Sequence, residues 1–143
     1  MNIPYFHVDA FTQNRFSGNA AGVCLLSSPL SDQVLRQMAQ EHHLAETAFV
    51  TVDESQLQLR WFTPELEMDL CGHATLAAAH VLFSEGRAQR WLKEQGVQLG
   101  DQICFSTVSG VISVYTHPSM GMSSSYTLDL PERAPTQLSE WGD

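Results

Sequence analysis

The chain has 143 residues and a formal net charge of −9, with seven Lys and Arg against sixteen Asp and Glu. Its length fits one domain whose core needs no disulfide or metal to hold it. So few basic residues argue against nucleic acid and anionic membranes as partners, because both are bound through Lys and Arg. The cysteines Cys24, Cys71 and Cys104 are odd in number and include no CxxC pair, which argues against a disulfide framework or structural zinc.

The ends and apolar segments of the chain predict its compartment. The opening segment, "MNIPYFHVDAFT", lacks the basic and apolar regions of a secretory signal. The longest apolar helical stretch, "ATLAAAHVLF", is far shorter than the roughly 20 residues of a membrane span. We therefore predict a cytoplasmic protein with no membrane partner.

Taken in chain order, short runs of β-branched and aromatic residues between turn signals predict strands. These runs are residues 3–11, 21–27, 46–52, 57–64, 102–108, 110–117 and 125–130. In the fourth run, Leu57, Leu59 and Trp61 alternate with other side chains, which predicts one buried face. The short connection 53–55 between the third and fourth runs predicts a hairpin.

Two segments have helical patterns. Residues 32–43 are amphipathic and follow Ser31, which is a suitable N-cap. Residues 73–84 are apolar almost all round, and such a helix is normally enclosed by other structure. Gly86 is predicted to close this second helix, and residues 87–100 are too weakly patterned to predict an element.

Many strands around one apolar helix predict an α+β fold. We expect residues 1–130 to form the domain. Residues 131–143 contain prolines and charges and leave little to bury, so they are predicted to be a linker or tail.

The segment "DLCGHAT" places a glycine and a histidine where the apolar helix begins. A helix start has unpaired N–H groups and positive dipole character, so it suits a carboxylate or phosphate. Gly72 would let a ligand approach the backbone closely, and His73 could serve as an acid or base, a substrate donor or a metal ligand. In the alternative interpretation, Gly72 only permits a tight turn and Asp69 only caps the helix.

A metal site is not predicted. His73 and His80 are two helical turns apart, too distant to share one ion easily, and no third ligand has suitable spacing. The "EHH" segment at 41–43 also differs from the HExxH pattern. We interpret His80 as a hydrogen-bonded core histidine.

Two further residues could transfer protons. Cys71 precedes the helix start, which lowers the pKa of a thiol, but a buried cysteine is more often a small hydrophobe. A Cys71–His73 thiol hydrolase would lack an orienting third group. Glu46 heads an apolar strand, so it is either a solvated strand-end acid or a buried one whose pKa is raised, as a proton shuttle needs.

The segments "DAFTQNRFSGNAAGV" (9–23), "AETAFV" (45–50) and "LRWFTPELEMDLCGHATLAAAHVLF" (59–83) occur together and in this order. With the strand pairs that follow, they resemble the PhzF-like family of phenazine-biosynthesis isomerase homologues, which is related in fold to diaminopimelate epimerase. The resemblance covers about residues 3–130. It implies two similar domains, each an antiparallel sheet curled around a central helix, of which this chain would be the N-terminal half.

The resemblance also implies a cofactor-free isomerase that moves a proton on a small carboxylated molecule. It places Glu46 as the acid/base, and Gly72 and His73 at the substrate-binding helix start. Gly18 and Asn19 would belong to a loop that lines the same cleft.

Cys71 falls where the related epimerases keep a catalytic thiol, so the resemblance makes it a secondary catalytic candidate. The family's active site lies between two domains, and this chain ends where the second would begin. Three interpretations stay open: a fragment that is inactive alone, a homodimer whose copies complete each other, or a non-catalytic ligand- or protein-binding half-domain. We expect self-association, a small anionic metabolite as partner and little turnover by the isolated chain. Neither the substrate nor a part in phenazine biosynthesis follows from the residues.

Overall fold

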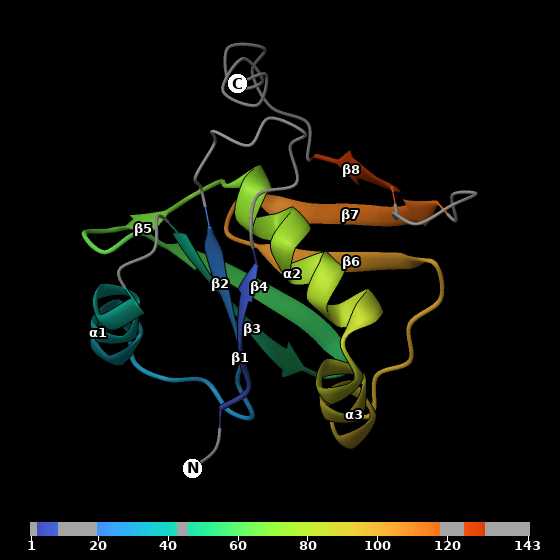
Figure 1. Cartoon of the computed structure of the whole chain (residues 1–143), viewed down its shortest axis with the longest axis horizontal. Helices are drawn as coiled ribbons and strands as arrows, with labels where there is room; N and C mark the ends of the chain where they lie inside the picture. The colour runs from blue at the N-terminus through green and yellow to red at the C-terminus, as the bar shows by residue number, and fades with distance from the viewer. Residues whose placement is uncertain (1–2, 9–19, 43–45, 118–124, 131–143) are drawn as a thin grey trace.

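The computed structural model describes residues 3–8, 20–42, 46–117 and 125–130, which form one curled sheet and three helices (Figure 1). The strands are β1 (Tyr5–Val8), β2 (Ala21–Leu25), β3 (Glu46–Asp53), β4 (Gln56–Phe62), β5 (Glu67–Met68), β6 (Gln102–Thr107), β7 (Gly110–His117) and β8 (Ser125–Asp129). The helices are α1 (Asp32–His42), α2 (Gly72–Ser84) and α3 (Gly86–Glu94). The predicted α+β class is confirmed.

The sheet has the strand order β1-β2-β3-β4-β6-β7-β8, with β5 paired to β4. Among the described strands, β2–β3 and β4–β6 are parallel pairs and the other neighbours are antiparallel. The mostly antiparallel arrangement that the sequence predicted is confirmed, but these two parallel pairs were not foreseen. Parallel neighbours require a crossover connection, which α1 supplies for β2–β3, and α2 with α3 for β4–β6.

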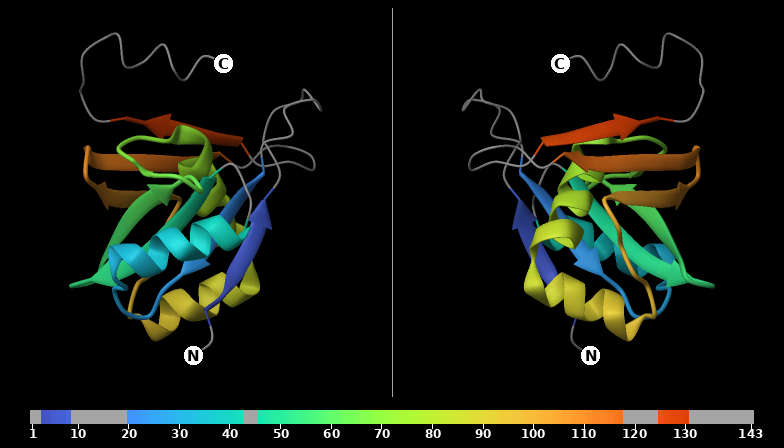
Figure 2. Two further views of the ribbon diagram at one scale, coloured as in Figure 1. Left: turned by 90° about the vertical axis from the view of Figure 1, so that its left-hand side faces the viewer. Right: turned by 90° about the vertical axis from the view of Figure 1, so that its right-hand side faces the viewer.

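Helix α2 lies inside the curl of the sheet (Figures 1 and 2) and contacts β1, β2, β3 and β8. It can approach the strands closely because its buried face is built largely from small side chains, namely Ala74, Ala77, Ala78 and Ala79. The predicted enclosed helix is therefore confirmed, with Gly72 as its first residue.

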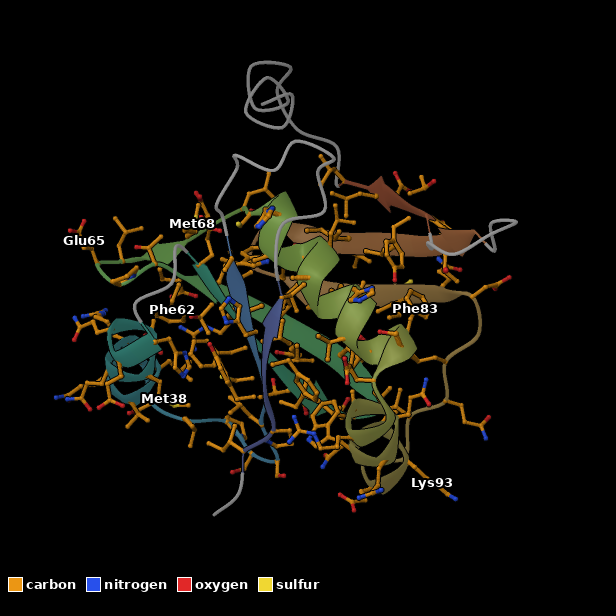
Figure 3. The ribbon with its side chains drawn as sticks, in the orientation of Figure 1. Met38, Phe62, Glu65, Met68, Phe83 and Lys93 are labelled. Atoms are coloured by element: carbon orange, nitrogen blue, oxygen red, sulfur yellow. The ribbon has the colours of Figure 1, made fainter. Side chains whose placement is uncertain are left out.

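Helix α1 packs on the opposite face of the sheet through Leu35 and Ala39, and Met38 adds a partly buried contact (Figure 3). These side chains meet Cys24, Leu26, Phe49 and Phe62. The Ser31 hydroxyl accepts a hydrogen bond from the Val34 N–H at 3.3 Å, so the predicted N-cap is confirmed.

Helix α3 corrects the sequence prediction. Gly86 does not close α2; it begins α3 within the segment for which no element was expected. Ala88, Trp91 and Leu92 form a short buried stripe at helical spacing, and the other positions after Gly86 are polar or charged. Such a stripe is too brief to stand out before its partners are known.

The predicted hairpin between β3 and β4 is confirmed as a two-residue turn. Glu54 and Ser55 both have positive φ, 52° and 65°, as a type I′ turn requires. Asn and Gly are the usual residues of such turns, so the conformation is strained here.

His80 has the environment that the sequence predicted. It is half-buried, and its Nδ1 lies 2.7 Å from the Tyr126 hydroxyl of β8. Phe83 stacks on the same tyrosine ring, so side chains of α2 hold the last described strand. Within the part of the chain that the structure describes, no helix is long and apolar enough to cross a membrane.

Candidate active site

The site forms where the first residue of β3 faces the first turn of α2. Ala48 and Val50, at alternate positions along β3, belong to the same buried core as α2. Glu46 has the same parity, so its side chain is on this face of the sheet. The parallel register pairs Glu46 with Ala21, the first residue of β2.

The Glu46 carboxyl is half-buried. Its Oε1 atom is buried and has no hydrogen-bond partner among the described residues. Burial raises the pKa of Glu46, and the nearby His73 offsets part of that rise. Of the two environments that the sequence left open for Glu46, the structure has the desolvated one beside the helix.

The start of α2 is built around Cys71, its N-cap residue, which has extended backbone (φ −153°, ψ 101°). In the described chain, no side chain caps this end of the helix. The Cys71 carbonyl accepts hydrogen bonds from the Thr75 N–H at 3.1 Å and the Thr75 hydroxyl at 2.7 Å. Asp69 therefore does not cap the helix, and the interpretation that gave it that role is wrong; its carbonyl accepts a hydrogen bond from the Ser109 hydroxyl instead.

The Cys71 thiol is buried at the same place. Burial raises its pKa to about 11; the N–H groups of Ala74 and His73 lower it, and the charge of Glu46 raises it. The helix start thus acts on the thiol in the predicted direction, but desolvation outweighs it. At neutral pH the thiol keeps its proton, which disfavours a thiolate nucleophile and leaves proton donation open.

The structure therefore brings Glu46, Cys71, Gly72 and His73 together from two elements. Gly72 is buried and His73 is half-buried. Gly18 and Asn19, the predicted loop residues of the site, lie outside the described residues. Among the residues that are described, no group of three or more His, Cys, Asp and Glu could hold a metal ion.

The sequence reasoning missed Thr75 and Trp61. The Trp61 indole N–H donates to the Thr75 hydroxyl at 2.9 Å, and both side chains are fully buried. The available signal was the hydroxyl of Thr75 inside the apolar run, because a buried hydroxyl must find partners; the other hydroxyl of the helix, Ser84, is at its exposed last residue.

A cavity of about 670 Å³ lies at the other end of α2, lined by side chains that include Leu82, Phe83, Leu92 and Lys93. Figure 3 labels Phe83 and Lys93 on the two helices that border it. Ten residues of helix separate Gly72 from Leu82, a rise of about 15 Å. The cavity is therefore separate from the site at Glu46.

Comparison with known proteins shows extensive similarity to one family. Residues 8–141 match the profile of the PhzC-PhzF family, described as phenazine biosynthesis-like protein. Two uncharacterized isomerases of Pseudomonas aeruginosa are 38% and 41% identical, over 138 and 135 residues. These alignments cover 96% and 94% of this chain but 47% and 46% of the relatives. The chain thus spans about half the length of the curated relatives that it matches.

Solved structures of the family share the fold. A PhzF-family protein of Enterococcus faecalis is 41% identical with a TM-score of 0.65, over 80% of this chain and 40% of that one. A PhzC/PhzF protein of Clostridium difficile is 33% identical with a TM-score of 0.64, over 99% of this chain and 52% of that one. The family match runs through residues 131–141, so the family's pattern continues into the segment predicted as a linker or tail. The chain belongs to the phenazine biosynthesis-like PhzC-PhzF family, as its motifs predicted.

Proposed function

We propose that this chain carries the proton-transfer half of a PhzF-type isomerase site, which acts on a small carboxylated substrate without a cofactor. The observation that carries the proposal is the environment of Glu46. Its carboxyl is partly desolvated, and one oxygen is buried without a partner among the described residues, next to the first turn of α2. An acid/base group needs this spare hydrogen-bonding capacity to engage a substrate proton.

The chemistry requires one group to exchange a proton and others to stabilise charge. The Glu46 carboxylate removes a proton from a substrate carbon, and the resulting carboxylic acid returns it to a different carbon, so the proton balance closes. A raised pKa makes Glu46 a stronger base and suits both steps near neutral pH. The positive end of α2 and His73 stabilise the substrate carboxylate and the enolate-like charge that forms between the steps. In this proposal Cys71 is a secondary proton donor.

We also propose that two copies of the chain associate. The relatives are about twice as long, and Glu46 is the first residue of β3, an interior strand of a described sheet whose terminal strands are β1 and β8. An unpaired strand edge favours association, and a two-fold interface over the end of β3 where Glu46 lies would bring two Glu46 side chains together. Sedimentation velocity at micromolar chain concentration should show a dimer; monomer alone would contradict this.

Deuterium exchange tests the proton transfer. Small amino acids and ring carboxylates are incubated with the chain in D₂O, and loss of substrate C–H signals is followed by NMR. We expect slow incorporation that increases with chain concentration and disappears in Glu46→Gln. Glu65→Gln, on the exposed connection between β4 and β5 (Figure 3), is the matched control and should exchange like the unsubstituted chain. Ligand-dependent stabilisation without exchange would instead identify a binding half-domain.

A further inference from the structure

A buried chain of hydrogen bonds joins the sheet to the first turn of α2. The Trp61 Nε1–H of β4 donates to Thr75 Oγ1 at 2.9 Å, and that hydroxyl donates to the Cys71 carbonyl at 2.7 Å. Trp61 and Thr75 are fully buried, and Cys71 is nearly so. The three residues form an ordered sequence from donor to final acceptor. We call it the Trp61–Thr75–Cys71 chain.

The Trp61–Thr75–Cys71 chain is also connected to Glu46 through the sheet. Trp61 is paired in register with Ala48 of β3, and Ala48 is two residues beyond Glu46 on the same face. The carboxyl and the helix start therefore sit on two ends of one continuous path. It runs along β3, across the β3–β4 ladder to Trp61, and through the Thr75 hydroxyl to Cys71.

We propose that Thr75 is a positioning residue of the site: its hydroxyl, oriented by Trp61, holds the first turn of α2 in place against Glu46. This inference rests on the proposed function and deepens it, because it names what keeps the two halves of the site together. Thr75 touches no reacting atom in this role. It acts through the Cys71 carbonyl and, beyond it, through the N–H groups of the same turn.

The hydroxyl does more than close a local bond. A threonine in a helix often donates to the carbonyl four residues before it, which needs no other partner. Here the oxygen also accepts from another element, so the first turn is tied to β4 as well as to its own helix. The competing explanation is that Thr75 serves only to satisfy the buried indole N–H of Trp61.

Two substitutions at Thr75 and one double variant separate these explanations. Thr75→Val keeps the shape and removes both hydrogen bonds, whereas Thr75→Ser keeps the hydroxyl. Trp61→Phe combined with Thr75→Val leaves no indole N–H unpaired, and Trp61→Phe alone is its reference because the smaller ring leaves a cavity in both. The Glu46 carboxyl is titrated by ¹³C NMR in each chain, and thermal unfolding is recorded alongside.

We expect the pKa of Glu46 to fall toward its ordinary value in Thr75→Val, because a loosened helix start admits water to the carboxyl. Thr75→Ser should restore the raised pKa. Thr75→Val should cost less thermal stability in the Trp61→Phe background than alone, while the lowered pKa of Glu46 persists in the double variant. This split between stability and titration is what a purely structural role would not produce.

The contrary results are equally distinct. A raised Glu46 pKa that is unchanged in all three variants overturns the positioning role and leaves the proposed function standing. An ordinary Glu46 pKa in the unsubstituted chain removes the support for the proposed function itself. If Thr75→Val does not fold, the comparison of the double variant with Thr75→Ser decides the question by the same criterion.

Discussion

The two helices that pack on opposite faces of the sheet differ in how far they are enclosed. Helix α2 is surrounded by strands, with α3 alongside, and is apolar on most of its surface. Helix α1 covers the other face with one narrow stripe and presents the rest to solvent. The candidate site lies at the first turn of the enclosed helix. A functional group is held most precisely where its supporting element has no room to shift.

The largest expected effect comes from placing a charge on each helix at matched positions. Ala78 of α2 and Ala39 of α1 are both 0% exposed. Ala78→Asp should cost about 4 kcal/mol in the free energy of unfolding, because the carboxylate has no route to water. Ala39→Asp should cost about 2 kcal/mol, since α1 can separate locally from the sheet and hydrate the charge. Urea denaturation measures both, and equal losses would show that the faces unfold as one unit.

A smaller loss of unfolding free energy is expected from substituting Arg60, whose polar contacts connect α1 to the sheet. Arg60 of β4 makes a bidentate pair with Glu67 of β5, with both N···O distances 2.8 Å, and contacts Asp32 of α1 at 3.0 Å. The arginine side chain is 36% exposed, so solvent screens these contacts. Arg60→Lys loses the fork geometry and should cost about 0.5–1 kcal/mol. Arg36→Lys, on the exposed side of α1, is the control and should change thermal stability by less.

The smallest effects concern pH and have opposite signs on the two faces. On the site face, burial raises the pKa of Glu46 above its unfolded value, so the folded state binds the proton more tightly. Its contribution to stability is present below the unfolded pKa and is lost as the pH rises through the folded pKa. Glu46→Gln should therefore be slightly more stable than the unsubstituted chain at neutral pH, by less than about 1 kcal/mol for a screened group. The advantage should vanish in acid.

On the α1 face, burial lowers the pKa of His42, with an opposing influence from Glu41. The unfolded state then binds the proton more tightly, so stability is lost as the pH falls from the unfolded pKa through the folded one. His42→Gln should reduce the loss of unfolding free energy as the pH falls. Glu46→Gln should increase that loss, because it removes a group that stabilises the folded state in acid. Urea denaturation at pH values between 4 and 8 covers the ordinary pKa values of Glu and His, about 4.3 and 6.5. A change of stability with pH in the opposite direction would contradict the prediction for that group.

Much of the fold follows from local patterns, and the remainder depends on long-range partners. The apolar run 73–84 and the alternation at Leu57, Leu59 and Trp61 predicted a buried helix and a half-buried strand, and both are present. Alternation cannot name the neighbouring strand, so the parallel pairs β2–β3 and β4–β6 were not foreseen.

The site was predictable in its residue types and less so in its environments. The motifs identified Glu46, Cys71 and His73, which the structure places near one another. The direction of the pKa shift of Cys71 was not predictable, because burial raises this pKa and the helix start lowers it, and the outcome depends on how completely the sheet covers the thiol. Thr75 was missed for a similar reason: its partner Trp61 is 14 residues away in the chain.

The parallel pairing of β4 with β6 has a consequence for the order of assembly. The chain between these strands contains α2 and α3, so β6 can join the sheet only after this long connection has folded back across it. Closing such a loop carries an entropic barrier that the hairpins at 53–56 and 107–110 do not face. We expect the β3–β4 hairpin and α2 to form the folding nucleus and the strands β6, β7 and β8 to pair with the sheet afterwards. The turn that holds the candidate site would then be among the first parts of the molecule to become native.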